Sequence, residues 1–496
     1  MCKKLTEFVN NQPTGAGARG AFFCVPLRGK HCSNQKRNNL ALIKSISGFR
    51  GTIGGKPGDN LTPQDIVECT AAFGQWILET TGNPSVVVGR DGRVSGDIVS
   101  QLAIAALRSV GISVTDLGLS TTPTVEMAVA AEGAGGGIIF TASHNPMEWN
   151  ALKLLNSKGE FISAADGAAV LARVESGQIS YATVDRLGGY RTDDSYIARH
   201  IDTILALDLV QPDLVRAQGY SVVLDAINST GALAVPPLLE ALGCTVTVIN
   251  GDITGRFAHN PEPLREHLEQ LALEVRQNGA QLGIAVDPDV DRLVFTDENG
   301  ALFGEEYTLV AVADYVLSKR KGDTVSNLSS SRALRDVTLR HGGAYHAAAV
   351  GEVNVVAKMK EVGAVIGGEG NGGVILPDLH YGRDALVGIA LFLSHLAEKR
   401  CSVSALRQTY PQYYMCKTKM ERRPDTNLDA AFALLRAKYQ GEQINLEDGL
   451  KIDFARGWVH LRPSNTEPII RVYAESGTPE VAEALANQII RDLSQI

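Results

Sequence analysis

Three aspartates at alternating positions are the strongest candidates for chemistry in this sequence. Asp287, Asp289 and Asp291 stand between two apolar runs, in the stretch GIAVDPDVDRLVF at 283–295. In an extended chain, residues two apart point to the same side, so we expect the three carboxylates to converge. Converging negative charges need a cation, and oxygen ligands favour magnesium or calcium. Arg292, beside them, could hold a phosphoryl oxygen.

The aspartate spacing also imitates the start of an EF-hand loop, with Glu298 at the twelfth position. That loop needs glycine where Arg292 stands, and the apolar residues 293–295 continue as a strand. We therefore reject an EF-hand. A solvated acidic turn without a metal is the remaining alternative.

A second candidate is Ser143, in the stretch TASHNP at 141–146. An apolar run leads into it, and Asn145 with Pro146 predicts a fixed turn, so the serine would stand at a strand end where ligands bind in α/β sheets. A serine hydroxyl alone is a weak nucleophile, and His144 could assist only by turning back toward it. An ordinary polar turn that ends a strand is the alternative.

A glycine-rich stretch, GGEGNGG at 367–373, could contact a sugar. Glycines let the backbone come close to a ligand, while Glu369 and Asn371 offer acceptors and donors that suit sugar hydroxyls. The stretch LHYGRD at 379–384 follows it. A flexible loop is the alternative for this segment.

A fourth stretch, LRPSNTEPIIR at 461–471, has the composition of a phosphate-binding turn. A guanidinium, two hydroxyls and an amide lie close together between prolines, which suits a phosphate dianion. The polar residues are Arg462, Ser464, Asn465 and Thr466. The stretch lacks the Gly-Lys-Ser/Thr of a Walker loop, and a capped turn between two strands is the alternative.

Repeated α/β units must position these groups. The order strand, Gly/Ser-rich turn, helix, strand occurs at 86–117, at 222–249 and, more loosely, at 324–350. The wide spacing predicts three related α/β domains rather than a solenoid. A smaller α+β domain should follow, with a helix near 428–439, strands around 450–461 and a closing helix from Pro479. We expect a disordered leader at 1–40, α/β domains at 41–195, 196–302 and 303–410, and the α+β domain at 411–496.

Composition limits the class of protein and its partners. The chain has 496 residues and a net charge of -8, which argues against nucleic-acid binding. Seven cysteines without CxxC spacing suggest neither a zinc site nor a disulfide framework, and no apolar run reaches the roughly 18 residues of a membrane span. We expect a cytoplasmic protein. The basic leader could also be a targeting segment or an over-long gene start.

Taken together and in this order, the four stretches resemble the α-D-phosphohexomutase superfamily, over nearly everything from Leu42 onward. The resemblance implies three related α/β domains and a fourth of another type around a central cleft. It also implies an intramolecular phosphotransferase of the isomerase class. Such an enzyme interconverts hexose 6-phosphate and hexose 1-phosphate through a phosphoserine and a hexose 1,6-bisphosphate intermediate, which also acts as activator.

The resemblance assigns roles to residues of this chain. Ser143 would carry the phosphoryl group and, with Asp287, Asp289 and Asp291, hold Mg²⁺ beside Arg292. Arg50 and Lys153 match basic positions near the transferring phosphate and in acid/base work. Residues expected to bind the phosphosugar substrate are His144, Glu369, Asn371, Arg383, Arg462, Ser464, Asn465, Thr466 and Arg471.

Two departures leave the sugar open. Many relatives carry Ser-Gly-His in the sugar loop, whereas Asn-Gly-Gly stands at 371–373, so His380 or Arg383 could substitute for the histidine. Glu352 stands where some relatives have histidine. We favour glucosamine phosphate, with mannose or glucose phosphate as the alternative. A phosphatase and a silent phosphosugar-binding protein are competing functions, and a monomer or homodimer is expected without nucleic-acid or membrane partners.

Overall fold

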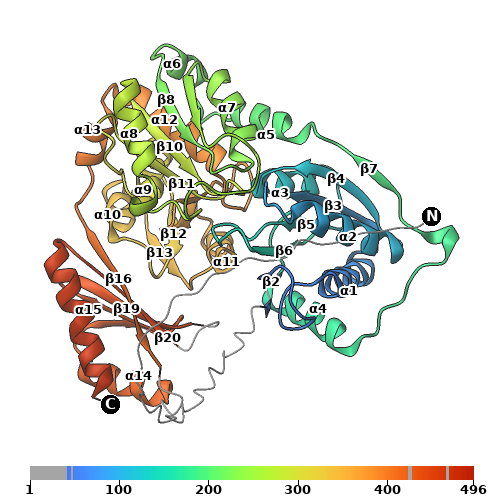
Figure 1. The fold of residues 1–496 in the computed structure, drawn as a ribbon. Coiled ribbons are helices and arrows are strands. Elements are labelled where there is room, and N and C mark those ends of the chain that lie inside the picture. Colours follow the sequence, from blue (N-terminus) through green and yellow to red (C-terminus); the bar gives the residue numbers. More distant parts are fainter. Residues whose placement is uncertain (1–41, 46–47, 423–426, 465–468, 496) are drawn as a thin grey trace, which may run out of the picture. The chain divides into compact units, whose positions relative to one another are not determined.

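The computed structural model describes residues 42–45, 48–422, 427–464 and 469–495. Four sheets follow one another along this part of the chain (Figure 1). The leader expected at 1–40 lies outside the described residues. Among the described helices, none is both long and apolar enough to span a membrane.

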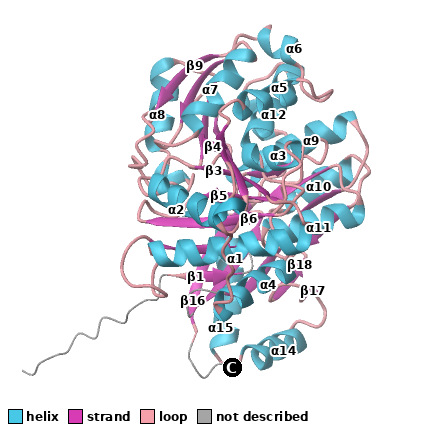
Figure 2. Ribbon diagram, turned by 90° about the vertical axis from the view of Figure 1, so that its right-hand side faces the viewer, coloured by secondary structure: helices cyan, strands magenta, loops and turns pink. Residues whose placement is uncertain are grey.

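The first sheet has seven strands in the order β1-β2-β6-β5-β3-β4-β7, with parallel strands at its centre. Val86 and Val88 of β3 pack with α1 and α2, whereas Val87 packs with α3, so helices cover both faces (Figure 2). The elements are β1 (Ile43–Ser45), β2 (Gly48–Thr52), α1 (Pro63–Thr81), β3 (Ser85–Arg90), α2 (Gly96–Ser109), β4 (Ser113–Leu119), α3 (Thr122–Ala131), β5 (Gly136–Phe140), β6 (Trp149–Leu155), α4 (Ala164–Ser176), η1 (Val184–Arg186) and β7 (Tyr190–Thr192).

The second sheet has the strand order β11-β10-β8-β9, and its β11 is the antiparallel edge strand. Two helices precede the sheet and two connect its parallel strands. The elements are α5 (Tyr196–Leu205), α6 (Pro212–Arg216), β8 (Ser221–Asp225), α7 (Gly231–Ala241), β9 (Thr245–Ile249), η2 (Arg265–His267), α8 (Glu269–Asn278), β10 (Leu282–Val286) and β11 (Leu293–Thr296).

The third sheet has the corresponding order β13-β12-β14-β15, with β15 antiparallel. Its elements are α9 (Glu305–Lys319), β12 (Thr324–Asn327), α10 (Arg332–Arg340), β13 (Tyr345–Ala348), α11 (Glu352–Val362), β14 (Ile366–Glu369), β15 (Gly373–Ile375), α12 (Ala385–Lys399) and α13 (Val403–Gln408).

The predicted repeat is confirmed in these three sheets. The units β3-α2-β4, β8-α7-β9 and β12-α10-β13 each join two paired parallel strands through a helix. In every copy a third parallel strand then turns back into an antiparallel one, at β5–β6, β10–β11 and β14–β15. Ser143, the three aspartates and Glu369 lie at these three reversals. The candidate loops are therefore the same turn in three copies of one domain.

The fourth sheet is antiparallel, in the order β16-β20-β19-β18-β17, and packs one face on α15 and α14. This confirms the predicted α+β architecture of the C-terminal part. The elements are β16 (Tyr414–Glu421), α14 (Leu428–Lys438), β17 (Gln443–Asn445), β18 (Leu450–Phe454), β19 (Gly457–Pro463), β20 (Ile469–Ser476) and α15 (Pro479–Ser494).

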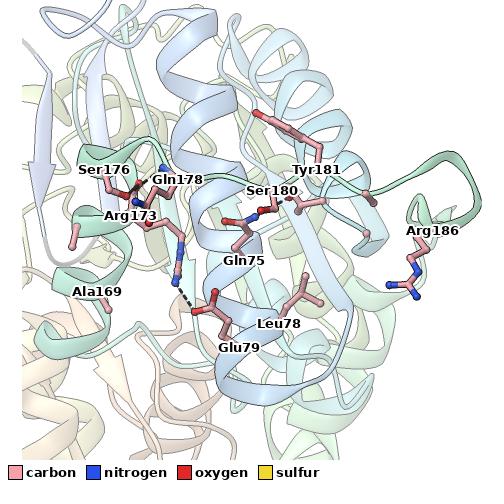
Figure 3. Close-up of a pocket in the computed structure, with 14 residues that line it drawn as sticks. Gln75, Leu78, Glu79, Ala169, Arg173, Ser176, Gln178, Ser180, Tyr181 and Arg186 are labelled. Atoms are coloured by element: carbon pink, nitrogen blue, oxygen red, sulfur yellow. Dashed lines mark hydrogen bonds and ion pairs between the residues drawn. The ribbon is translucent and has the colours of Figure 1, made fainter.

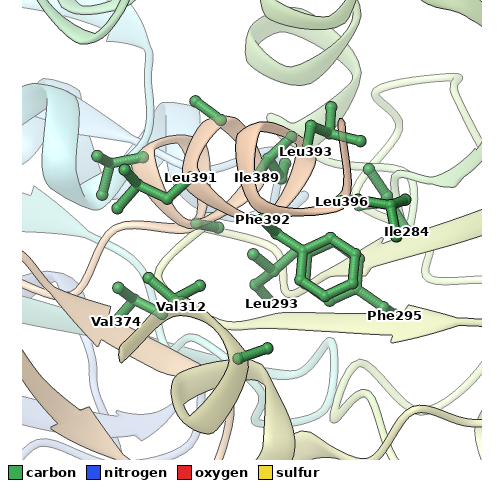
Figure 4. Packing of buried hydrophobic residues seen from close by; sticks show 14 of the residues in the cluster. Ile284, Leu293, Phe295, Val312, Val374, Ile389, Leu391, Phe392, Leu393 and Leu396 are labelled. Atoms are coloured by element: carbon green, nitrogen blue, oxygen red, sulfur yellow. The ribbon is translucent and has the colours of Figure 1, made fainter. Parts of the chain in front are cut away.

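Helix α12 joins the cores of the second and third sheets. Its Phe392 stacks on Phe295 of β11 with ring centroids 3.8 Å apart, and Val374 of β15 belongs to the same cluster (Figure 4). The metal-candidate loop before β11 and the sugar-candidate loop before β15 are therefore anchored on one continuous core.

Replacing Phe392 with alanine should lower the free energy of unfolding by about 3–5 kcal/mol, because the fully buried ring leaves a cavity. Urea denaturation followed by circular dichroism measures the change. Leu339→Ala, at a position 58% exposed on α10, is the control and should change stability by about 0.5 kcal/mol or less. Similar losses in both variants would contradict this account of the shared core.

Candidate active site

The loop after β5 presents Ser143 in a left-handed backbone conformation, with φ of 48°. Few residues other than glycine adopt this conformation without support. The Ser143 N–H donates to Thr141 Oγ1 at 2.9 Å, and the Thr141 hydroxyl donates to Asp91 Oδ2 at 2.6 Å. The serine is thus held by a chain of hydrogen bonds that leads back to the end of β3.

Arg93, which sequence reasoning missed, fixes the same loop. It is 1% exposed, and its Nε lies 3.0 Å from Asp91 Oδ2. Its terminal nitrogens donate to backbone carbonyl oxygens of the loop, those of Ser143, Asn145 (2.7 Å), Pro146 (2.8 Å) and Trp149 (3.0 Å). The available signal was the Asp-Gly-Arg stretch directly after a predicted strand. Its meaning depends on burial, because a buried arginine needs acceptors for its donors.

The three aspartates converge, but not through the extended chain that the alternating spacing predicted. That expectation was wrong because the segment between β10 and β11 is a turn, with Val290 at φ of 62°. Asp287 Oδ1 accepts the N–H groups of Asp291 and Arg292, each at 3.1 Å, and this closes the turn. The three side chains are fully buried, with one oxygen of each within 4.8 Å of the others.

The serine and the aspartates meet directly. Ser143 Oγ donates to Asp287 Oδ2 at 2.6 Å, although the two residues belong to different sheets. His144 Nδ1 lies 3.3 Å from the same hydroxyl. Burial, followed by the charges of Arg292 and Arg50, lowers the pKa of His144 to about 2, so this imidazole is neutral at pH 7.

Basic side chains surround this meeting point. Lys153 Nζ lies 2.7 Å from Asp289 Oδ2 and 3.2 Å from Asp291 Oδ2. Burial opposes its charge, but Asp289 and Asp291 outweigh burial and raise the pKa of Lys153 above its usual value. Arg50 donates to Asn145 Oδ1 at 3.1 Å in the serine loop, and Arg292 donates to Glu262 Oε1 at 3.3 Å.

The aspartate cluster fits a divalent cation. Asp289 Oδ1 and Asp291 Oδ1 are buried and have no hydrogen-bond partner among the described residues. Burial and then the charges of Asp291 and Asp289 raise the pKa of Asp287 well above its usual range, which reflects concentrated negative charge. Three carboxylates without a nitrogen or sulfur ligand suit a hard ion such as Mg²⁺. The cluster could therefore bind a metal through Asp287, Asp289 and Asp291.

Arg383 connects the aspartates with the glycine-rich loop. It donates to Asp291 Oδ2 at 2.7 Å and to Glu369 Oε2 at 3.0 Å. Its backbone N–H and its Nε donate to the two oxygens of Glu352, both at 3.0 Å. Glu352 and Arg383 are thus partners, which gives the glutamate at this position a structural role.

The polar residues of the glycine-rich loop bond mainly to the protein. Glu369 Oε1 accepts from Asn327 Nδ2 at 2.9 Å and from the Gly351 N–H at 3.2 Å. Asn371 Oδ1 accepts from the Gly373 N–H at 3.2 Å. Glu369 and Arg383 are hydrogen-bonded to one another and to other groups of the protein, so a sugar would have to compete with these bonds.

The candidate phosphate turn is described only in part. Arg462 of β19 and Arg471 of β20 are cross-strand partners, so both side chains point to one face of the sheet. Arg462 Nε lies 2.7 Å from Asp448 Oδ2, and the Ser464 N–H donates to the Ile469 carbonyl at 2.9 Å. Asn465 and Thr466 lie outside the described residues. The turn remains a prediction as a phosphate site.

A cavity lined by described residues lies elsewhere. It has a volume of about 820 Å³ and is lined by α1, α4 and the segment after α4, including Gln75, Arg173 and Tyr181 (Figure 3). Arg173 pairs with Glu79 across it. None of the predicted site residues lines this cavity, and it brings no group of reactive side chains together. The buried charges, rather than this hollow, define the candidate site.

Models of known families match nearly the whole described chain. Their descriptions are "Phosphoglucomutase/phosphomannomutase, alpha/beta/alpha domain I" at 42–179, "domain II" at 198–300, "domain III" at 304–414, and "C-terminal domain" at 416–492. A phosphoglucomutase/phosphomannomutase of Thermococcus kodakarensis is 37% identical, over 87% of this chain and 95% of its own. A probable phosphoglucosamine mutase of Methanopyrus kandleri is 33% identical, over 90% of this chain and 96% of its own.

A solved structure shares the whole architecture. The phosphoglucomutase/phosphomannomutase family protein of Burkholderia thailandensis superposes with a TM-score of 0.79 at 26% identity, over 92% of this chain and 97% of its own. Fold and site together define a phosphohexomutase, an isomerase that moves a phosphoryl group within a sugar phosphate. The chain belongs to the phosphoglucomutase/phosphomannomutase family.

Removing the arginine that holds the serine loop should destabilise the protein. Arg93→Ala leaves Asp91 buried without its cation, and we expect a loss of about 3–5 kcal/mol in urea unfolding. Arg93→Lys keeps the positive charge but not the planar guanidinium, so it should lower the free energy of unfolding by less than Arg93→Ala does. Arg199→Ala is the control. Arg199 is exposed and pairs with Asp193 at 3.6 Å, so this variant should lower the free energy of unfolding by less than about 1 kcal/mol. Equal losses for Arg93→Ala and Arg199→Ala would contradict the role of Arg93.

Proposed function

We propose that this enzyme interconverts hexose 6-phosphate and hexose 1-phosphate by carrying a phosphoryl group on Ser143. One observation carries the proposal: Ser143 Oγ lies 2.6 Å from Asp287 within a buried group of three aspartates. A serine used as a phosphate carrier needs a cation beside it rather than a neighbouring base. His144 agrees with this, because its lowered pKa makes it a poorer base than an ordinary imidazole, although its Nδ1 lies 3.3 Å from the hydroxyl.

Two phosphoryl transfers would complete the reaction. Phosphoserine gives its phosphoryl group to the free hydroxyl of the hexose phosphate: the bond from phosphorus to Ser143 Oγ breaks, a bond to the sugar oxygen forms, and the hydroxyl proton is released. The hexose 1,6-bisphosphate then turns end for end. Its other phosphoryl group passes to Ser143 Oγ, and the sugar oxygen that is released takes up a proton. The sum is an isomerisation without net loss of phosphate.

The chain's cations suit the charge of this reaction. Lys153, whose ammonium is held by Asp289 and Asp291, can stabilise the transferring group and return a proton to the released oxygen. Arg50 lies in contact with the serine loop and Arg292 beside the aspartates. Mg²⁺ held by Asp287, Asp289 and Asp291 together with the serine phosphate would neutralise charge on the phosphoryl oxygens.

The remaining predicted residues would hold the rest of the substrate. The phosphate that is not transferred would meet the arginine pair of β19 and β20 and the turn between these two strands. The residues are Arg462, Ser464, Asn465, Thr466 and Arg471. His144, Glu369, Asn371 and Arg383 would contact the sugar, with Glu369 and Arg383 exchanging their mutual hydrogen bond for it.

Among sugars we favour glucosamine phosphate, with mannose or glucose phosphate as the alternative. The buried carboxylates of Glu369 and Glu352 support this choice, because an amino sugar carries an ammonium group that a carboxylate can accept. The name of the Methanopyrus kandleri relative points the same way, while that of the Thermococcus kodakarensis relative points to glucose and mannose.

A coupled assay tests the reaction and its sugar. The enzyme is given glucosamine, mannose and glucose 1-phosphates in turn, with Mg²⁺ and a hexose 1,6-bisphosphate. We expect formation of the 6-phosphate, fastest with glucosamine, and no release of inorganic phosphate. Turnover of none of the three would refute the mutase proposal, and stoichiometric phosphate release would indicate a phosphatase instead.

Ser143→Ala should lower turnover by about three orders of magnitude or more, because the carrier oxygen is lost. Intact mass spectrometry before and after phosphatase treatment should detect one removable phosphate on the wild type and none on the variant. Ser157→Ala, at an exposed turn after β6, is the matched control and should keep both properties. Unchanged turnover in Ser143→Ala would instead favour a chain in which Ser143 carries no phosphate.

A further inference from the structure

A second buried cluster, separate from the three aspartates, consists of His200, His380 and Asp384. His200 comes from α5, and the other two residues come from the segment that leads into α12. Asp384 Oδ2 lies 2.9 Å from His200 Nε2 and 3.3 Å from His380 Nε2. One ligand atom of each residue lies within 4.8 Å of the others, and no lysine or arginine forms an ion pair with Asp384 among the described residues.

The spacing suits a four-coordinate metal ion. In a tetrahedral zinc site the metal lies about 2.0–2.1 Å from nitrogen and oxygen ligands, which places neighbouring ligand atoms about 3.3 Å apart. The 3.3 Å between Asp384 and His380 matches this value, whereas the 2.9 Å between Asp384 and His200 is shorter, so these two side chains would move slightly apart around the ion. Two imidazoles with one carboxylate suit Zn²⁺ and its neighbours in the first transition row rather than Mg²⁺, because Mg²⁺ prefers oxygen ligands alone.

Each candidate ligand faces a polar group outside the cluster. His200 Nδ1 lies 2.9 Å from Thr124 Oγ1, and His380 Nδ1 lies 3.3 Å from Glu126 Oε2. Asp384 Oδ1 accepts the N–H groups at the start of α12, from Leu386 and Val387. Metal-binding histidines usually place their second ring nitrogen against an oxygen in this way, which sets the tautomer and the ring orientation.

Glu126 is a buried carboxylate that faces the cluster through His380. Its side chain is 1% exposed, and neither carboxylate oxygen has a hydrogen-bond partner among the described residues. An unsatisfied buried carboxylate is costly. A metal on His380 Nε2 would leave the proton on Nδ1, facing Glu126 Oε2, and so would provide this carboxylate with a donor. Gly382 permits the close approach, because a Cβ there would lie 1.8 Å from Glu126 Oε2.

We propose that His200 Nε2, His380 Nε2 and Asp384 Oδ2 bind a divalent transition-metal ion such as Zn²⁺. The His380 side chain is 12% exposed, which leaves an approach for the ion and for a water as fourth ligand. The ion joins α5 to the start of α12, and its outer partners come from α3, so it ties segments of the first three domains together. Arg383, the residue before Asp384, donates a hydrogen bond to Asp291. An ion on Asp384 therefore also restrains the candidate active site.

The competing account is a hydrogen-bonded network without metal. Burial opposes a charge on His380, but hydrogen bonds and charges from Asp384 and Glu126 outweigh burial and raise the pKa of His380 to about 10. An imidazolium would then bridge the two carboxylates. The two accounts differ in whether the folded enzyme takes up zinc.

Zinc uptake by the full-length enzyme separates them. Metal-free protein in excess Mg²⁺, which occupies the aspartates, is titrated with Zn²⁺ against a chromophoric chelator. We expect one tight equivalent in the wild type, and affinity at least about 100-fold lower in His200→Gln and His380→Gln. Thr124→Val, which removes an outer partner, should weaken binding about 10–100-fold. His341→Gln is the matched control, because His341 pairs with Asp314 outside the cluster, 2.7 Å away, and should bind as the wild type does.

A second measurement uses the unmodified enzyme and so does not depend on the variants folding. Co²⁺ added in excess Mg²⁺ should produce the intense visible absorption of four-coordinate cobalt. No tight equivalent of zinc, or only the weak absorption of six-coordinate cobalt, would overturn the proposal. Zinc binding that survives in both histidine variants but is lost in Asp287→Asn would also overturn it, by assigning the ion to the aspartates. None of these outcomes depends on which sugar the enzyme uses.

Discussion

The burial of three like charges in one turn is the constraint on which the rest of this site depends. Asp287, Asp289 and Asp291 are removed from water, so cations and donors from elsewhere in the chain must balance them. Lys153 comes from the first sheet and Arg383 from the segment after the third. The charge balance therefore connects three domains. Two aspartate oxygens still have no hydrogen-bond partner among the described residues, so the charge balance can accommodate a divalent ion.

One turn, used three times, places the serine, the aspartates and the glycine-rich loop. In each of the first three sheets, a parallel strand reverses into an antiparallel one at the carboxyl end of the parallel strands. Repetition also extends to the loop after the first strand of each unit. Asp91, Asp225 and Asn327 each accept the N–H two residues later, and this turn starts the connection to the helix. Different chemistry thus arises from the same backbone by substitution at equivalent positions.

Arg383 shows how departures from a family pattern can compensate one another. Its guanidinium and backbone contact Glu352, Glu369 and Asp291, so the carboxylate at 352 and the arginine at 383 depend on each other. Next to it, Asp384 faces His200 and His380. Arg383 therefore belongs to a network of carboxylates, whereas the next residue, Asp384, belongs to a cluster with two histidines. Both networks join segments that are distant in the sequence, so both tie the domains together.

The sequence by itself determined the features that depend on local patterns. Strand, turn and helix periodicity identified the three repeated units, and the aspartate and serine stretches were recognisable because their residues are close in the chain. Tertiary structure decided what depends on contacts between distant segments. Asp91 and Arg93 hold a loop about 50 residues away, and His200 meets Asp384 across 184 residues. The aspartates converge through a turn rather than an extended strand, because Asp287 binds the backbone of Asp291 and Arg292. Side-chain pairing of this kind leaves no periodic trace in a single sequence, so only the folded chain could reveal it.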